Sequence, residues 1–292
     1  MAVSTLANLT NENRIFYEKA LIKRLLPMLH AYNDAQKSVL PQNSGTTVNW
    51  RKFTSLAIPE SELQEGVTPA GTSLAVSKVE GVAKQYGDFV TISDLLAYAG
   101  IDKAMTEGAL LCGEQAALLI DTVVLNAMGE TTNTMGTASA ELTETLVKQV
   151  VLKLKRANAR RFEDGYFHAI ISPAQAYALM NQQGWVDAAK YGSIKKLLKG
   201  EVGELHGVRF MESTNIHESD GSASCFIYGA DSYGVVDMEG GAGKPSIITK
   251  DFGSAGVNDP LEQRATVGWK NLFCAKVLDS AAIVKVTTKV EA

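Results

Sequence analysis

The chain has 292 residues, of which 46% are hydrophobic and 21% are charged, and this composition is typical of a globular protein with a packed core. Its formal net charge of −4 argues against a protein that reads nucleic acid, because such proteins are usually strongly basic. The three cysteines are widely spaced among apolar or small residues, and the opening residues do not resemble a secretion signal, so we expect reduced thiols and an intracellular site of synthesis.

The N-terminal segment predicts a polar start followed by helical stretches. Residues 1–13 are polar and rich in Asn and Thr, and we expect them to be extended. Residues 13–26 carry apolar side chains near helical spacing, which predicts an amphipathic helix. A further helical stretch is predicted over residues 28–40, with Pro41 as its stop.

Residues 46–92 have the pattern of a long, two-stranded arm. The outgoing run, residues 46–58, is rich in β-branched and aromatic side chains that alternate with polar ones. The tip, residues 59–71, is acidic and contains Pro and Gly, which favours an open loop over a tight turn. An isolated ribbon of this kind is only marginally stable, so the arm is expected to pack either on its own domain or on another copy of the chain.

The longest periodic segment spans residues 101–128. Its apolar side chains recur at helical spacing and predict one amphipathic helix, roughly 40 Å long. Charged residues within it argue against a membrane span; they are Asp102, Lys103, Glu107, Glu114 and Asp121. Residues 131–140 are mostly small and form a candidate boundary between domains.

The second half of the chain mixes helices and strands. A helix is predicted over 142–161, followed by a buried strand at 166–172 and another helix from Pro173. Residues 201–213 are strand-like, and the remaining chain is rich in strands. Five are expected, at 224–228, 233–236, 246–249, 265–269 and 282–286. Helices in the middle with strands scattered around them indicate an α+β fold.

No pattern predicts a catalytic, metal-binding or cofactor-binding residue. The four histidines form no ligand pair at helical spacing, and no Cys-x-x-Cys is present. Residues 240–246 superficially resemble a phosphate-binding loop, but Pro245 stands where Ser or Thr would bind magnesium. An enzyme whose site assembles from distant residues is the alternative from another functional class.

A basic cluster near the predicted helix over 142–161 has two interpretations. It is either a contact for a polyanion or a solvated helix face, and the acidic residues beside it favour the second. Its members are Lys153, Lys155, Arg156, Arg160 and Arg161.

Four short segments, in their order along the chain, carry a resemblance to a known family. They are residues 65–70 (Glu-Gly-Val-Thr-Pro-Ala), 84–94, 203–209 (Gly-Glu-Leu-His-Gly-Val-Arg) and 259–270, the last being the most specific. With the arm, the long helix and the closing strands, they resemble the major capsid proteins of tailed double-stranded DNA phages, which have the Hong Kong 97-type shell fold. More closely, the chain is similar to the branch typified by the coat protein of phage N4.

The resemblance implies a division into domains. The implied parts are an N-terminal arm (1–45), an extended loop (46–92), a peripheral domain with the spine helix (93–140), an axial domain (141–250) and a C-terminal β part of the peripheral domain (251–292). The extended loop would lie over a neighbouring subunit, which provides the partner that the arm lacks.

The resemblance also implies function and partners. The chain would be a structural protein, not an enzyme, whose pentamers and hexamers form an icosahedral shell around phage DNA that is bound without sequence specificity. It would assemble in the cytoplasm of a bacterial host, without a membrane, with a separate scaffolding protein, a portal and a decoration protein as further partners. The alternative within the fold is the shell protein of an encapsulin-type nanocompartment.

Candidate contacts between subunits follow from this implied assembly. Large apolar side chains carry much of the energy of an interface, which selects Trp50, Phe53, Leu56 and Leu63 in the arm. Asp259, Glu262 and Arg264 form either a charged contact at a subunit boundary or a plain surface cluster. Some relatives crosslink Lys to Asn between subunits, but no residue here marks that chemistry, and we expect none.

Overall fold

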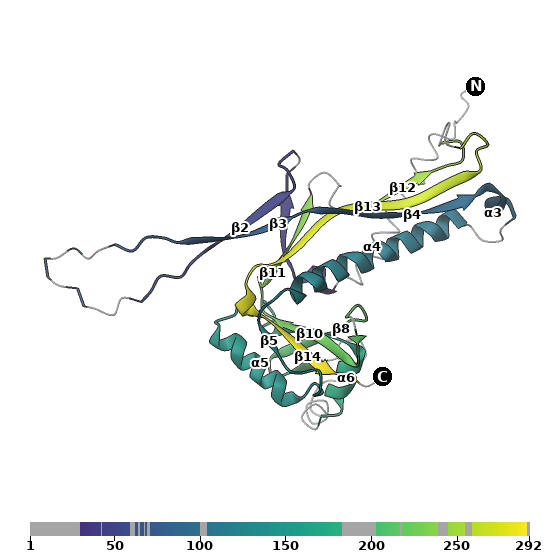
Figure 1. Cartoon of the computed structure of the whole chain (residues 1–292). Coiled ribbons are helices and arrows are strands. Elements are labelled where there is room, and N and C mark those ends of the chain that lie inside the picture. The colour runs from purple at the N-terminus through teal and green to yellow at the C-terminus, as the bar shows by residue number, and fades with distance from the viewer. Residues whose placement is uncertain are drawn as a thin grey trace.

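The protein is an elongated α+β molecule with a projecting arm (Figure 1). The computed structural model describes residues 30–41, 43–58, 62–63, 65–66, 68, 71–99, 104–182, 203–216, 218–238, 245–254 and 259–290. One sheet and the longest helix form the upper body in Figure 1, and a second sheet with two helices forms a lobe beneath it. The predicted helix over residues 13–26 lies outside the described residues.

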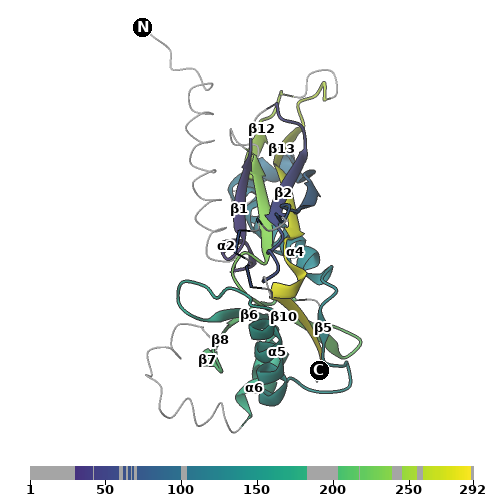
Figure 2. The ribbon, with the colours of Figure 1, turned by 90° about the vertical axis from the view of Figure 1, so that its left-hand side faces the viewer.

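The described chain begins with a short helix and a strand. Helix α2 spans His30–Asn33, and strand β1 spans Gln36–Leu40 and pairs in parallel with β11 (Tyr233–Met238). Figure 2 shows β1 in the upper body, with α5 and α6 in the lobe below. The prediction of a helix over residues 28–40 is therefore wrong after Asn33, because pairing with a strand distant in sequence outweighs local helical spacing.

The sheet of the upper body is organised around one long strand. Strand β13 (Arg264–Val277) pairs with β4 (Lys84–Ser93) along one edge. Along its other edge, the first half of β13 pairs with β12 (Ser246–Lys250) and the second half pairs with β11. Because both edges of β13 are paired, the strand runs well beyond the predicted residues 265–269.

The predicted long helix is present as α4 (Ala104–Gly129), preceded by the short α3 (Asp94–Ala99). It packs on one face of β13 through small and branched side chains, and the buried ones include Ala109, Cys112, Ala116, Ile120, Val124 and Met128. Residues Met105–Gly129 are long and apolar enough to cross a membrane, but more than half of the apolar stretch is buried in the protein. The helix is therefore explained by its place in the core.

Asn271 is a polar side chain buried between α4 and β13. It lies on the same face of β13 as Trp269 and Phe273, only 1% of it is exposed, and its amide has no hydrogen-bond partner among the described residues. Burying an unpaired amide costs about 1–3 kcal/mol. We expect Asn271→Leu to raise the free energy of unfolding by about 1–2 kcal/mol in denaturant titrations of the unassembled subunit. A destabilised Leu variant would contradict this account.

The second sheet is covered differently on its two faces. Alternate residues of its strands pack under α5 and α6 on one side, as Phe167, Phe210 and Ile227 do. Others, such as Ile170 and Phe226, face the C-terminal half of α4. The elements are β5 (Thr134–Met135), α5 (Glu144–Arg156), β6 (Phe167–Ile171), α6 (Pro173–Met180), β7 (Gly203–Leu205), β8 (Val208–Glu212), β9 (Glu218–Ser219), β10 (Ser222–Tyr228) and β14 (Ile283–Lys289), with a 3-10 turn at Ser280–Ala282.

Both helices of the lobe begin at capping residues visible in the sequence. The Thr143 hydroxyl accepts a hydrogen bond from the Leu146 amide at the start of α5. At α6, Ser172 and Gln175 form a reciprocal capping box, and Pro173 occupies the first turn. These caps fix where the helices begin, close to the predicted starts.

The chain crosses between the two parts more often than the predicted domain division implies. β11 and β12 belong to the predicted axial range, yet they pair in the sheet of the upper body. β14 belongs to the predicted peripheral range, yet it pairs with β10 in the lobe. The division into assembly domains stays a prediction, but its boundaries in sequence do not coincide with the two sheets.

Candidate assembly interface

The arm is a ribbon with little to pack against in its own chain. Among the strands that the structure describes, β2 (Thr47–Phe53) and β3 (Val76–Val82) pair only with each other, in antiparallel register. Beyond them the chain continues outward to a loop far from the body (Figure 1). Its large apolar side chains lie in solvent: Ile58 is 86% exposed and Leu63 77%. Phe53, Leu56, Leu74 and Val76 are also exposed.

Such a row of exposed apolar side chains marks an interaction surface. Phe53, Leu56 and Leu63 were selected from the sequence as contacts between subunits, and they are accessible in the single chain. Leu74 and Val76 on the returning run add to the same surface, and the period-two pattern of the sequence also contains them.

Trp50 has a different environment from the rest of the arm. Its indole Nε1 donates a hydrogen bond to the Ser38 hydroxyl at 2.9 Å, and Trp50 packs against a small buried cluster that contains Leu40 and Val236. A Cβ added to Gly81 would lie 2.8 Å from the ring, so only glycine permits this approach. Trp50 thus anchors the root of the arm to its own sheet, and its contact with another subunit stays a prediction.

The predicted charged cluster lies in the turn that leads into β13. Asp259 is buried, and its Oδ2 accepts a hydrogen bond from the Arg264 backbone amide at 2.8 Å, with the guanidinium Nε 3.8 Å away. Glu262 has a positive φ of 55° within the same turn. Asp259 therefore has a local structural role, and a role of the cluster between subunits stays a prediction.

Sequence reasoning missed an apolar patch at this end of the upper body. α3 exposes Leu95, Leu96 and Tyr98, and the turn before β13 exposes Leu261. The two segments adjoin, because the Asp94 amide donates to the Gln263 carbonyl at 3.0 Å. The run of apolar residues after Ser93 is the signal in the sequence that could have revealed this patch.

A shallow groove crosses the outer face of the upper sheet. Two glycines on neighbouring strands line it: a Cβ on Gly87 would lie 2.6 Å from the Trp269 carbonyl oxygen, and one on Gly268 would lie 2.7 Å from Phe89 Cβ. Phe89 and Ile248 contribute apolar side chains to the lining, which also includes Lys250 and Lys270. The lining therefore combines apolar side chains with two cations and one carboxylate, that of Asp88.

The remaining candidates for chemistry have ordinary structural surroundings. All three cysteines are buried and free, and burial raises the pKa of the Cys225 thiol to about 12, which keeps it protonated and unreactive. Within the described ranges, no three His, Cys, Asp or Glu side chains lie close enough to hold a metal ion. The glycine-rich residues 239–244 and His217 lie outside those ranges.

The basic cluster is divided between structural and exposed residues. Arg160 pairs with Asp231 at 3.2 Å, and the Arg161 guanidinium lies over the Phe167 ring at 5.4 Å. Lys153, Lys155 and Arg156 are exposed near the end of α5, where cations complement the helix dipole. This arrangement favours the interpretation as a solvated helix face.

Comparison of the sequence with family models gave no match, and none of the curated proteins matches it either. The three-dimensional structure is similar to many solved structures. The capsid of Ralstonia phage GP4 matches with a TM-score of 0.70 and 12% identity, over 89% of this chain and 88% of that one. The capsid of cyanophage Pam1 matches with a TM-score of 0.65 and 15% identity, over 91% and 92%. A virus-like particle from Pyrococcus furiosus matches with a TM-score of 0.56 and 14% identity, over 92% and 96%.

The structural similarity extends over most of each chain, although the sequences are only 12–15% identical. Coverage near nine-tenths means that the likeness concerns the arrangement of most of the chain and not a single element. The chain has the Hong Kong 97-type fold of phage capsid proteins.

Proposed function

We propose that this protein is the major capsid protein of a tailed phage and assembles as pentamers and hexamers into the icosahedral shell around double-stranded DNA. One observation carries the proposal: the chain matches the capsid of Ralstonia phage GP4 over 89% of its length while holding out an apolar arm that its own body does not cover. An isolated two-stranded ribbon is only marginally stable in water, and its exposed apolar side chains mark a surface that a partner would bury.

The arm and the groove lie toward opposite ends of the subunit, which suits association from head to tail (Figure 1). When the surface that one copy offers differs from the one that receives it, the copies form a closed ring if the rotation closes. The arm tip carries Glu60, Glu62 and Glu65, and the charged residues that line the groove are Lys250, Lys270 and Asp88, so the cations outnumber the carboxylate. Opposite charges of this kind favour one docking register over others.

The finer assignments belong to the same proposal. Residues 46–92 would be the extended loop that crosses to the neighbour, and the lobe with α5 and α6 would be the axial part that gathers at the centres of the capsomers. The kinship with the N4-type branch rests on the four sequence segments alone. Phe53, Leu56 and Leu63 would make contacts between subunits, as would the cluster of Asp259, Glu262 and Arg264.

The partners would be a separate scaffolding protein, a portal, a decoration protein and the packaged DNA, in a virion assembled in the bacterial cytoplasm. The mild net charge of −4 suits a shell that must release its DNA, because strong contacts with phosphates would hold it back. The proposed role is structural and involves no catalysis.

Expression of the chain alone and with a candidate scaffolding protein tests the proposal. We expect rings, tubes or shells in negative-stain electron microscopy and fast-sedimenting species in velocity centrifugation, because many weak contacts add up in a closed lattice. Small uniform shells filled with a host enzyme would indicate the nanocompartment instead. A monomer at every concentration, with scaffold present, would refute both.

A further inference from the structure

One histidine in the lobe lies between two carboxylates. The His168 Nδ1 is 2.6 Å from Asp34 Oδ2, and its Nε2 is 2.9 Å from Asp164 Oδ2. An ionised carboxylate only accepts hydrogen bonds, so each ring nitrogen must carry a proton to complete both contacts. The geometry is therefore that of an imidazolium, and a neutral ring could make only one of the two bonds.

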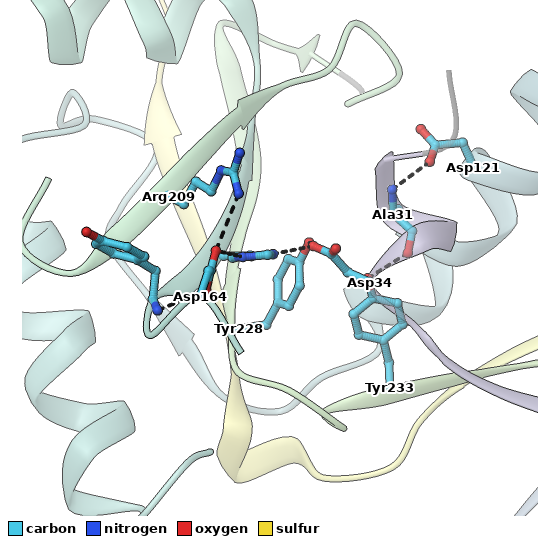
Figure 3. A network of polar contacts seen from close by, with 9 residues as sticks. Ala31, Asp34, Asp121, Asp164, Arg209, Tyr228 and Tyr233 are labelled. Atoms are coloured by element: carbon cyan, nitrogen blue, oxygen red, sulfur yellow. Dashed lines mark hydrogen bonds and ion pairs between the residues drawn. The ribbon is translucent and has the colours of Figure 1, made fainter. Parts of the chain in front are cut away.

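Further contacts hold the ring and both carboxylates in place. The Phe162 ring is stacked on the imidazole with centroids 3.9 Å apart, and only 10% of the His168 side chain is exposed. Tyr228 donates to Asp34 Oδ2 at 2.9 Å, and Arg209 to Asp164 Oδ2 at 3.4 Å (Figure 3). A second groove lies beside the ring, and the other charged groups that line it are Arg160, Arg161, Glu163 and Asp231.

Asp34 is the point where the N-terminal segment reaches the lobe. A few residues earlier, the same segment is attached to the upper body. The Ala31 amide donates to Asp121 of α4 at 3.2 Å, and the Ala31 carbonyl accepts from the Tyr233 hydroxyl at 2.6 Å (Figure 3). Strand β1 then pairs with β11. Residues 30–41 therefore bridge the upper body and the lobe.

We propose that His168 is a proton-controlled clamp, which when protonated fastens residues 30–41 to the lobe and when neutral releases Asp34. The clamp would set how firmly the N-terminal segment connects the two parts of the subunit. It is a property of the single subunit and holds whether or not the chain forms shells.

The electrostatics give the direction of the effect. Burial lowers the pKa of His168, but the hydrogen bonds and charges of Asp34 and Asp164 outweigh it, so the pKa is raised above its usual 6.5. For Asp164, burial raises the pKa, but the hydrogen bonds from His168 and from the Tyr166 amide outweigh burial, and the pKa of Asp164 is lowered. Because the folded pKa of His168 is raised, its stabilising contribution is complete below the unfolded value and is lost as pH rises through the folded value.

Hydrogen–deuterium exchange of peptides covering residues 30–41 tests the clamp between pH 6 and 9. After correction for the intrinsic pH dependence of amide exchange, we expect their protection to fall with rising pH, up to tenfold for each unit by which the pKa of His168 is raised. Peptides from the centre of α4 report global unfolding, and their protection should fall by no more than the same factor, because the same proton contributes to the stability of the whole fold.

Two variants identify the titrating group. His168→Gln should reduce protection of residues 30–41 at pH 6 and abolish its pH dependence, whereas His206→Gln, at an exposed histidine that contacts Glu144, should retain the wild-type profile. If His168→Gln does not fold, Asp34→Asn provides the second test and should move the fall in protection to lower pH. A wild-type profile that is flat from pH 6 to 9, or one unchanged by these clamp variants, would overturn the proposal.

Discussion

Joining Phe53 to Val76 through an Asn-Gly turn is expected to abolish assembly while the subunit still folds. These two residues face each other in the β2–β3 pair, so a two-residue hairpin turn can close the shortened ribbon. The removed residues 54–75 include Leu56, Ile58 and Leu63, which are exposed in the single chain. Each such side chain contributes about 1.5–3 kcal/mol when fully buried, so several kcal/mol of association energy per subunit would be lost.

A finer pair of variants separates apolar contacts from loop length. Leu56→Ser, Ile58→Ser and Leu63→Ser combined should reproduce the loss of assembly in velocity sedimentation. The matched control Thr54→Ala, Ser55→Ala and Ser73→Ala, in the same loop, should assemble normally. Thermal unfolding of the separated subunits should differ little among all of these, because the described apolar side chains of the loop are exposed in the single chain. Shells of normal yield from the shortened arm would show that the arm is not an assembly contact.

The second large effect is expected in the lobe, where Phe210→Ala should lower the free energy of unfolding by about 3–5 kcal/mol. Phe210 is completely buried under α5 and α6, and its removal leaves a cavity that the rigid sheet cannot fill. Denaturant titration measures the loss, and hydrogen exchange locates it. We expect faster exchange in β6, β8 and β10, with little change in the centre of α4.

Tyr177→Ala is the control for this variant, because that side chain on α6 is 71% exposed and its removal should change stability by less than about 0.5 kcal/mol. Equal acceleration of exchange in α4 and in the lobe would mean that the two parts unfold together. The proposed division into separate peripheral and axial domains would then lose its physical basis.

Local patterns predicted the elements whose determinants are local. Helix α4 follows from its apolar spacing, and the starts of α5 and α6 follow from Thr143 and from the pair Ser172 and Pro173. The alternation in residues 46–58 predicted the outgoing strand of the arm, and the family resemblance predicted the fold that the structure shows.

The failures involve partners that are distant in sequence. The local spacing of residues 28–40 predicts a helix, but β1 is extended because it pairs with β11. That partner lies about two hundred residues further along the chain, so local spacing could not reveal it. Trp50 could be recognised as a large side chain in the arm, but its bond to Ser38 depends on β1 being a strand. The bridge through His168 also could not be foreseen, since Asp34 and Asp164 come together only when both sheets have formed.

The pairing of β13 has a mechanical consequence. The strand is hydrogen-bonded to β4 from Arg264 to Phe273, to β12 and β11 on its other edge, and is followed by the turn that leads directly into β14 in the lobe. Hydrogen bonds between antiparallel strands lie across the strand direction, so a pull along β13 strains many of them at once and cannot peel them apart singly. If the proposed shell is under internal pressure, tension that passes from the lobe to the upper body along β13 would act in the direction in which this sheet is most resistant to separation.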